Sequence, residues 1–365
     1  MLTHKTASIA VVGAGLAGSA CARALRQAGH RVQVFDKARG PGGRLATRRF
    51  EWLREDGAPG RARLDHGALG FTAGSEAFQD FLREMQGLGV VTPWVPDLAP
   101  DSLPLEREGP LLVATPDMPA LCRQLLAGMG TQWSAQVDRL TRDETGWQLH
   151  VGDQAVAETF DVVVLAIPPA QAAVLLNGLR DDWARYASLV PMQPCWTLMG
   201  VAAVEAQDAA RESQWSLARP ETGPLAWVMR NDRRPGRSAD AGQAQWVVHA
   251  RAGWSRLNLE QDADWVKHQL STALEVVLGH RVRWLHSVVH RWRYALPPMS
   301  RTPAHPQPPA PHHWWDERMG LGVCGDLFTG HGMDGVEGAY LSALALVDAM
   351  RGSLPTSTPQ PSAAV

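Results

Sequence analysis

The sequence has few lysines, no long apolar run and almost no net charge. Lysine occurs only at Lys5, Lys37 and Lys267, and the remaining basic residues are arginines. No apolar stretch reaches the roughly 18 residues that a membrane helix needs, and residues 1–7 lack the apolar segment of a secretory signal. The net charge of −2 argues against nucleic acid as the main partner, because phosphate binding requires a basic surface. We therefore expect a cytoplasmic protein that binds neither membrane nor nucleic acid.

Cysteine is also scarce. Cys21, Cys122, Cys195 and Cys324 form no C-x-x-C pair, and each lies in an apolar segment. They are expected to be buried free thiols rather than disulfides or metal ligands. No Ser–His–Asp, paired-carboxylate or metal-spaced cluster is evident, so no metal site is predicted and no residue is assigned with certainty as acid, base or nucleophile.

A glycine-rich pattern near the start is the strongest feature that is present. The apolar run 9–12 predicts a buried parallel strand, and Gly13, Gly15 and Gly18 after it fit G-x-G-x-x-G. The first glycine permits a tight turn, the second lets backbone approach a pyrophosphate, and the third lets helix pack closely on strand. A parallel strand that ends in this pattern predicts a dinucleotide site.

The residues after the glycines complete this motif. An amphipathic helix is predicted over Leu16–Gln27, so the backbone at Leu16 and Ala17 would face the diphosphate with the positive end of the helix dipole. Val32–Phe35 is the second strand, and Asp36 at its end can accept hydrogen bonds from ribose hydroxyls.

A second glycine motif follows Asp36 and Lys37. Its residues are Gly40, Gly42, Gly43 and Arg44. This spacing resembles the second glycine motif of glutathione-reductase-like and amine-oxidase-like flavoproteins, in which the glycines pass close to FAD and the arginine lies near its phosphates or flavin. The resemblance implies non-covalent FAD as the cofactor. A surface turn with a solvated arginine is the alternative.

The rest of the chain predicts an α/β fold, with a Rossmann-type FAD-binding domain and a second α+β domain on an antiparallel sheet. Residues 50–63 look loop-like. Helices are expected over 75–87, 115–128, 262–278 and 335–350, a hairpin over 133–151, and buried strands over 161–169 and 320–326. Short alternating runs at 195–201, 226–231, 245–251 and 286–295 predict the antiparallel sheet.

The domain boundaries follow from this reading. The FAD-binding domain is predicted to comprise residues 1–95, 110–170 and 316–352, and the substrate domain residues 171–315, with 96–109 as a crossing segment. The proline-packed stretch 296–312 is expected to be an exposed loop, and residues 353–365 a disordered tail.

Several segments together resemble one branch of this superfamily. They are residues 37–49, 65–72, 115–121, 194–196, 227–237, 246–254, 290–297 and 324–342. They are similar to the bacterial renalase-like FAD oxidoreductases, and the H-R-W-R-Y and W-V-x-H segments are the most particular. The resemblance implies oxidation of dihydro-NAD(P) isomers reduced at the wrong ring carbon. The products would be NAD(P)+ and, with oxygen as acceptor, hydrogen peroxide.

The resemblance also implies further cofactor contacts. Asp326 would bind the ribityl–pyrophosphate, Val137 would lie on the adenine side, and the helix after Asp326 would point its N-terminus at the isoalloxazine. The implied set is His66, Gly67, Val137, Gly325, Asp326, Val336, Glu337 and Ala339.

Five residues are predicted to line the substrate site. Trp292 or Tyr294 could stack on a nicotinamide ring, Asn231 or His249 could bond its carboxamide, and Arg230 could meet phosphates. Strand aromatics are also common in cores, and strand arginines are commonly solvated, so these alternatives stay open.

Two departures from the family pattern lie in segments expected near the flavin, so they bear on substrate specificity. The family usually has glutamine and an aromatic residue where Leu69 and Gly70 stand, and residues 327–335 are longer than its common pattern. A flavin amine oxidase or desaturase on the same scaffold is one alternative, although many amine oxidases hold a lysine near the flavin and none of the three lysines here is well placed for that. A non-catalytic flavin-binding protein is the other, supported only by Leu69 and Gly70.

Overall fold

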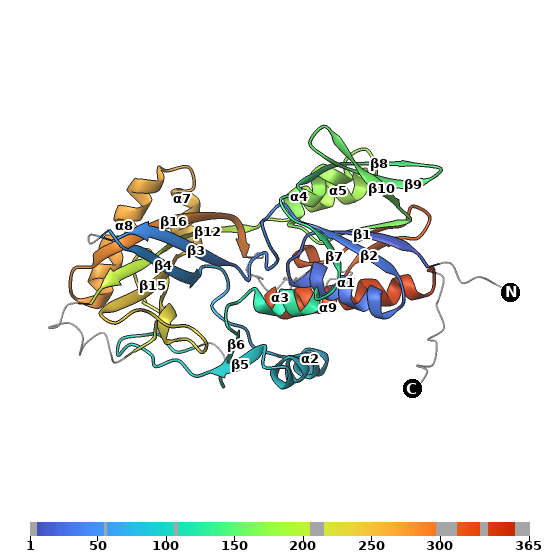
Figure 1. Cartoon of the computed structure of the whole chain (residues 1–365). Helices are drawn as coiled ribbons and strands as arrows, with labels where there is room; N and C mark the ends of the chain where they lie inside the picture. Colours follow the sequence, from blue (N-terminus) through green and yellow to red (C-terminus); the bar gives the residue numbers. More distant parts are fainter. Residues whose placement is uncertain are drawn as a thin grey trace, which may run out of the picture.

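Two sheets organise the chain into two lobes (Figure 1). The computed structural model describes residues 6–54, 57–105, 109–204, 215–296, 312–328 and 335–354. One lobe contains a mostly parallel six-stranded sheet and the other a five-stranded antiparallel sheet. The predicted fold class, a Rossmann-type domain with a second antiparallel-sheet domain, is confirmed.

The six-stranded sheet contains the predicted nucleotide-binding strands. Its strands are β1 (Ser8–Val12), β2 (Arg31–Phe35), β7 (Gly130–Gln132), β11 (Val162–Leu165), β17 (Trp314–Asp316) and β18 (Leu321–Val323). They lie in the order β17-β18-β11-β1-β2-β7, and only β17 is antiparallel to its neighbour. Strands β1 and β11 are buried along their whole length, as expected for strands covered on both faces.

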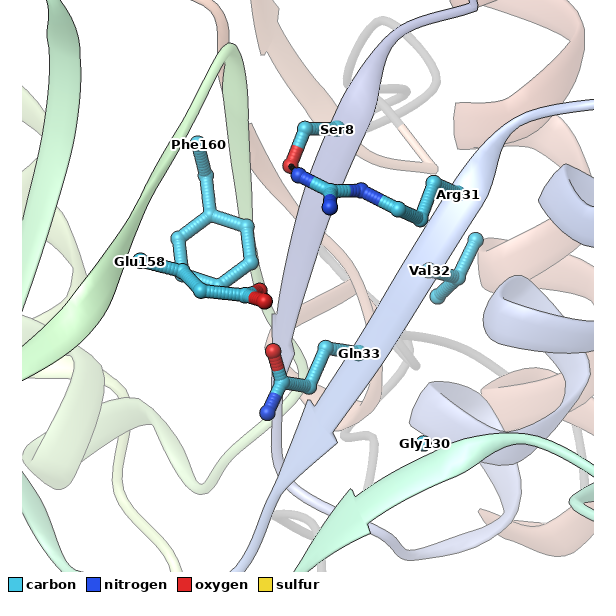
Figure 2. Close-up of a pocket in the computed structure, with 7 residues that line it drawn as sticks. All are labelled: Ser8, Arg31, Val32, Gln33, Gly130, Glu158 and Phe160. Carbon is cyan, nitrogen blue, oxygen red and sulfur yellow. Dashed lines mark hydrogen bonds between the residues drawn. The ribbon is translucent and has the colours of Figure 1, made fainter.

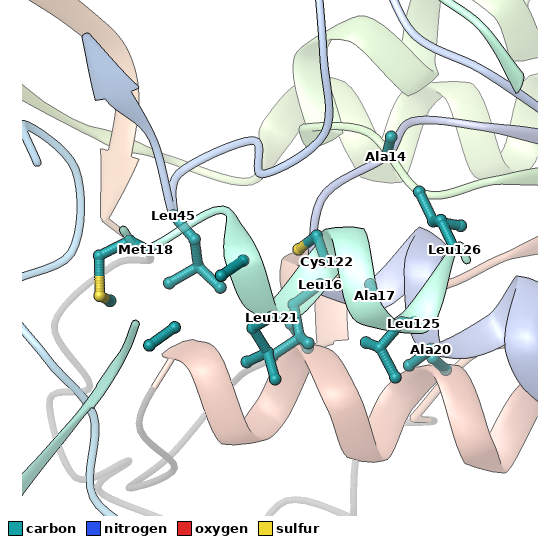
Figure 3. Close-up of a cluster of buried hydrophobic side chains, with 14 of the residues drawn as sticks. Ala14, Leu16, Ala17, Ala20, Leu45, Met118, Leu121, Cys122, Leu125 and Leu126 are labelled. Carbon is teal, nitrogen blue, oxygen red and sulfur yellow. The ribbon is translucent and has the colours of Figure 1, made fainter. Parts of the chain in front are cut away.

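One face of this sheet packs on three helices. They are α1 (Leu16–Gln27), which has the predicted bounds, α3 (Ala120–Leu125) and α9 (Gly335–Arg351). Figure 3 shows α3 lying over α1, with Leu121 and Leu125 close to Leu16 and Ala20. Helix α3 is shorter than the predicted 115–128, because Pro116 and Pro119 keep the segment before it out of the helix.

The other face is covered by two helices and a small sheet (Figure 1). The elements are α4 (Pro169–Leu176), α5 (Asp181–Leu189), β8 (Val137–Asp143), β9 (Gly146–Val151) and β10 (Gln154–Phe160). The predicted hairpin is present as β8 and β9, and β10 extends it to three strands.

The second lobe contains the predicted antiparallel sheet. Its strands are β12 (Gln193–Ala203), β13 (Leu217–Ala218), β14 (Leu225–Arg230), β15 (Gln243–Ala250) and β16 (Arg283–Leu296), in the order β13-β14-β15-β12-β16. One face packs on α8 (Ala263–Leu278), near α7 (Ala252–Leu257). Asp262 caps α8 by accepting a hydrogen bond of 2.8 Å from the Asp264 N–H.

A hairpin covers the opposite face, and here the sequence prediction was wrong. Residues 50–63 were expected to be loop-like, but β3 (Thr47–Leu53) and β4 (Pro59–Asp65) pair in register. The Trp52 ring lies over Gly60 so closely that a Cβ there would overlap it. Glycine and proline in β4 disguise its alternation, although Ala62 and Leu64 are buried and Arg61 and Arg63 beside them are exposed.

A smaller unit lies beneath the boundary between the lobes (Figure 1). Strands β5 (Val91–Trp94) and β6 (Leu111–Ala114) pair beside α2 (Glu76–Gly87), which confirms the predicted helix. Ser75 caps α2 by accepting the Phe78 N–H at 3.3 Å. Leu98 in the predicted crossing segment forms a bridge to Leu217, so this segment contacts the edge of the second sheet.

A surface pocket of about 300 Å³ lies at the far end of the six-stranded sheet (Figure 2). Its lining residues are Ser8, Arg31, Val32, Gln33, Gly130, Glu158 and Phe160. Most of them begin β1, β2 or β7. Ligands of such sheets bind at the carboxyl ends of the strands, so this pocket is not the dinucleotide site.

The four cysteines are free and buried, as predicted. Within the described ranges, no helix has the length and apolar character needed to cross a membrane. The segments predicted as an exposed loop and a disordered tail fall almost entirely outside the described residues.

Shortening Leu121 should destabilise the protein, because its side chain is fully buried between α3 and α1. We expect Leu121→Ala to lower the free energy of unfolding by about 2–5 kcal/mol. Leu257→Ala is the matched control, since Leu257 is 86% exposed and should change stability by less than about 0.5 kcal/mol. Urea unfolding measures both, and equal effects would contradict this packing.

Candidate functional site

The first glycine loop leaves no room for side chains. Gly13 has φ of +106°, and a Cβ there would overlap the Ala166 carbonyl. A Cβ on Gly18 would overlap the Gly13 carbonyl, so only glycine lets α1 approach β1 this closely. Gly15 is the N-cap of α1, and the first turn has neither a side-chain cap nor an acidic residue. The N-terminal N–H groups of α1 therefore suit a diphosphate.

Asp36 stands beside this loop. One carboxylate oxygen accepts the Ala14 N–H at 2.6 Å and the other accepts the Ala38 N–H at 2.8 Å. The carboxylate is partly exposed, so it can accept further bonds from ribose hydroxyls. Lys37 is exposed next to it, and Val137 is buried at the start of β8.

The second glycine loop touches the first. The Gly42 N–H donates to the Ala14 carbonyl at 2.9 Å. Gly43 has φ of +55°, and a Cβ there would lie 3.1 Å from the Gly15 Cα. Two loops that meet through backbone alone form one cradle, which side chains on either loop would fill.

Arg44 joins three distant parts of the chain. Its guanidinium pairs with the buried Asp326, and Nη1 lies 3.4 Å from the Ala295 carbonyl at the end of β16. Asp326 begins the short η2 helix (Asp326–Phe328), and the Gly325 N–H before it donates to Ser342 at 2.9 Å. The arginine and the aspartate that the sequence predicts as cofactor contacts therefore lie together at the boundary of the lobes.

The acidic side chain at the start of α9, Glu337, binds backbone N–H groups of the protein itself. Glu337 is buried, and its carboxylate accepts the N–H groups of Gly74 and Ser75 at 2.8 and 2.6 Å. Val336 and Ala339 pack in the main core. Any cofactor contact from Glu337 would thus come from its backbone.

His66 lies against an aromatic wall on the second sheet. Its ring stacks on Trp292 with centroids 5.1 Å apart and meets the edge of His290 at 5.0 Å. The His66 carbonyl accepts the Trp292 Nε1–H at 3.1 Å, and His249 Nε2 lies 3.3 Å from the same oxygen. We call His66, His249, His290 and Trp292 the aromatic wall.

The strand register explains why these residues meet. His249, Thr197 and His290 pair across β15, β12 and β16, so their side chains share one face of the sheet. The segment with His66 is held against the second glycine loop, because a Cβ on Gly67 would overlap the Arg44 carbonyl. The wall and the cradle therefore lie close to each other.

Burial keeps the imidazoles of the wall neutral. Burial, together with the nearby His290, Arg48 and His249, lowers the pKa of His66 to about 3, although Asp65 opposes the shift. The pKa values of His249 and His290 both fall to about 4, again mainly through burial. At neutral pH the wall carries no charge.

The other predicted substrate residues lie elsewhere. Arg230 is buried on the face that packs on α8, where it pairs with Asp232 at 2.9 Å and lies over the Trp246 ring. Asn231 is fully buried, and its amide binds the Arg63 carbonyl, the Gln245 side chain and the Asp65 N–H. That Arg230 and Asn231 contact the substrate stays a prediction, and the packing of both side chains does not favour it.

Tyr294 falls in an irregular part of β16. The pairing with β12 shifts between Trp292 and Leu296, so strand alternation does not place the Tyr294 ring. Gly70, where the renalase-like pattern has an aromatic residue, packs against β6, and a Cβ there would lie 3.1 Å from the Leu112 carbonyl. An aromatic side chain would not fit without moving β6.

Sequence reasoning missed the buried acid behind the wall. Asp65 is almost fully buried and pairs with Arg234 and Arg237 at 2.8 and 2.6 Å. The turn R-R-P-G-R carries three arginines beside a predicted core strand, which was a signal that a buried carboxylate would be needed. In the described part of the chain, no group of three or more His, Cys, Asp or Glu side chains could hold a metal ion.

Comparison with known proteins agrees with this geometry. Residues 11–85 match the model of the NAD(P)-binding Rossmann-like domain. A curated relative, the tRNA 5-methylaminomethyl-2-thiouridine biosynthesis bifunctional protein MnmC of Magnetococcus marinus, is 27% identical over 318 residues. The match covers 70% of this chain, and the chain spans less than half (46%) of the relative's length.

Solved structures resemble almost the whole chain. A protein assigned as a protoporphyrinogen oxidase from Exiguobacterium sp. 255-15 superposes with a TM-score of 0.65 at 12% identity, covering 95% of this chain and 99% of its own. Cyclohexylamine oxidase from Brevibacterium oxydans IH-35A superposes with a TM-score of 0.59 at 13% sequence identity, and the match covers 95% of this chain and 100% of that chain. A putrescine oxidase variant superposes with a TM-score of 0.62 at 14% sequence identity, and the match covers 95% of this chain and 99% of that chain. The chain therefore shares its overall fold with these three oxidases.

The neutral wall should make stability depend on pH. A histidine with a folded pKa of about 4 and an ordinary value of 6.5 is protonated more readily when unfolded. Its contribution is therefore complete above about pH 6.5 and is lost as the pH falls toward 4. For His249 the loss is about 2–3 kcal/mol between pH 7.5 and 4.5.

His249→Gln tests this, because glutamine keeps an N–H donor for the His66 carbonyl but does not titrate. We expect the variant to lose less unfolding free energy than the wild type between those pH values, as measured by urea unfolding. Equal losses in the two proteins would show that His249 is not held neutral by burial.

Proposed function

We propose that the protein is a FAD-dependent oxidase of dihydro-NAD(P) isomers reduced at ring position 2 or 6. The products would be NAD(P)+ and, with oxygen as acceptor, hydrogen peroxide. The observation that carries the proposal is the uncharged aromatic wall of His66, His249, His290 and Trp292 beside the glycine cradle. The fold alone is compatible with many oxidation reactions, so the choice of substrate is argued from the side chains of the wall.

The cradle supports FAD as the dinucleotide. The N-terminus of α1 would bind the diphosphate, and Asp36 the adenosine ribose. Arg44 and Asp326 would face the pyrophosphate and ribityl portion, because they lie where the cradle meets the second lobe. A nicotinamide dehydrogenase has no need of the second glycine loop, whereas an extended cofactor that crosses toward the second sheet does.

The proposed hydride transfer requires no acid or base from the side chains. Bound FAD would supply a two-electron acceptor, and hydride loss from a dihydropyridine restores an aromatic ring, so no strong base is required. The protein must hold the donor carbon close to the acceptor and keep water out. Trp292 and the imidazoles provide flat, neutral surface for this purpose, while their polar atoms hold the His66 carbonyl in place.

The wall offers no charged partner to a cationic substrate. An amine is protonated at neutral pH, and none of the four side chains of the wall is a carboxylate or a lysine. Of the lysines that the structure describes, Lys37 is exposed beside Asp36, and Lys267 pairs with Asp264 on α8 at 2.7 Å. A neutral dihydropyridine ring suits such a surface better than an ammonium group does.

Amine oxidation is the second candidate. Its support is the fold shared with putrescine oxidase and cyclohexylamine oxidase, together with a curated relative whose name refers to a methylaminomethyl group. A non-catalytic flavin protein is the third, but Gly70 now has a packing explanation, which weakens its only support.

Asp36→Ala should weaken FAD binding. Losing a charged hydrogen-bond acceptor costs about 1–3 kcal/mol, which is a 5- to 150-fold rise in the dissociation constant. Asp161→Ala is the control, because Asp161 also accepts an N–H beside β1, that of Ser8 at 2.7 Å, but at the opposite end of the strand. Flavin fluorescence titration measures both, and an unchanged constant in Asp36→Ala would refute its assignment.

A panel of electron donors tests the reaction itself. Under anaerobic conditions, 2- and 6-dihydro isomers of NAD(P) should bleach the flavin absorbance near about 450 nm rapidly. Ordinary 4-dihydro NADH and primary amines should act far more slowly, because a ring held against the wall places only some carbons within hydride reach. Reoxidation in air should yield peroxide equal to the substrate consumed. A faster reaction with an amine would favour the second candidate, and failure of every donor the third.

A further inference from the structure

A buried carboxylate behind the aromatic wall is held by two arginines. Asp65 Oδ2 accepts Arg234 Nη1–H at 2.8 Å, Arg237 Nε–H at 2.8 Å and Arg237 Nη2–H at 2.6 Å. The exposed fractions of the three side chains are 1%, 0% and 4% in the same order. Two guanidinium groups on one carboxylate leave a net positive charge inside the protein, where an unbalanced charge is costly.

The nearby acid Asp232 does not balance this charge. It is 11% exposed and pairs with Arg230, which is itself a cation. Arg234 Nη2 donates to the Leu69 carbonyl at 2.6 Å, and the guanidinium lies 5.4 Å from the Trp94 ring centroid. Burial lowers the pKa of Arg234 to about 10, so it stays charged at neutral pH. The surplus charge is therefore present under working conditions.

Asp65 is connected directly to the wall. Its other oxygen accepts the Met118 N–H at 3.2 Å and the Thr47 hydroxyl, and its own N–H donates to Asn231 at 3.1 Å. The next residue, His66, donates its N–H to the Ala46 carbonyl at 3.0 Å. The segment from Asp65 to Gly67 is thus clamped by the arginines on one side and by the wall on the other.

We propose that Asp65, Arg234 and Arg237 are positioning residues that place the His66–Gly67 segment beside the flavin and set its reduction potential through their surplus positive charge. This inference rests on the proposed FAD site. The three residues act through His66 and through the field of their charges. Reduced flavin carries negative charge at its pyrimidine edge, so a nearby buried positive charge stabilises the reduced form.

The number of charges can be varied in both directions. The wild-type group carries +1, Asp65→Asn would carry +2, and Arg237→Gln would carry zero. Asparagine keeps an oxygen for the Met118 N–H and the Thr47 hydroxyl. The double variant restores +1, so it tests whether charge rather than shape is responsible.

We expect Asp65→Asn to raise the flavin reduction potential and Arg237→Gln to lower it, with the double variant close to the wild type. Equilibrium reduction against reference dyes measures the potential of the bound flavin, and circular dichroism checks the fold. Asp316→Asn is the matched control, since it removes a partly buried carboxylate that pairs with Arg180 at 2.6 Å on β17, beside the start of β18 and away from the second sheet. It should reduce stability and leave the potential unchanged.

Shifts of the same sign in the two single variants, or potentials all equal to that of the wild type, would overturn the proposal and leave a purely structural ion group. If Asp65→Asn does not fold, Arg237→Gln alone decides by the sign of its shift. The measurement does not depend on the electron donor. A protein that binds FAD but oxidises no dihydronicotinamide disproves the proposed reaction and leaves this comparison valid, whereas one that takes up no FAD overturns both.

Discussion

Close backbone contact at glycine is the constraint on which the site depends. Gly18 lies against Gly13, Gly43 against Gly15, and Gly67 against Arg44, in each case with little or no room for a Cβ. These contacts join β1, α1, the second loop and the segment with His66 into one continuous surface. Side chains at these positions would fill the cradle or separate its parts, so the architecture of the site follows from where side chains are missing.

The boundary between the lobes is held by polar groups from distant parts of the chain. Arg44 follows the second glycine loop, Asp326 follows β18, and the Ala295 carbonyl ends β16. Glu337 joins the start of α9 to the start of α2 in a similar way. These polar contacts add to an apolar core that also runs through both lobes, since Val11 of the first sheet and Val247 of the second belong to one buried cluster.

The chemical character of the candidate site depends on the side chains that line it, and the fold does not determine these. The chain shares its fold with putrescine oxidase and cyclohexylamine oxidase, and its aromatic wall is built from neutral imidazoles and a tryptophan. Behind the wall lies a buried group of one aspartate and two arginines. The fold alone does not set the electrostatic surroundings of a bound ring, so the proposed substrate rests on the wall and not on the scaffold.

The sequence by itself determined the dinucleotide motif and the alternation of helices and strands around it. Strand β1, Gly13, Gly15, Gly18 and helix α1 are neighbours in the chain, so their geometry is a local property that the pattern reveals. The hairpin β3–β4 escaped prediction, because its strand character depends on Trp52 covering Gly60 and on the sheet that the hairpin covers.

Only the tertiary structure decided which side chains form the wall. Arg230 and His249 both lie in the second sheet, but their strands' register turns one toward α8 and the other toward His66. Asp65 and Arg234 are 169 residues apart, and nothing in the local pattern of either predicts their contact. A sheet face and a buried ion pair are set by which strands pair and in what register, and that depends on packing across the whole chain.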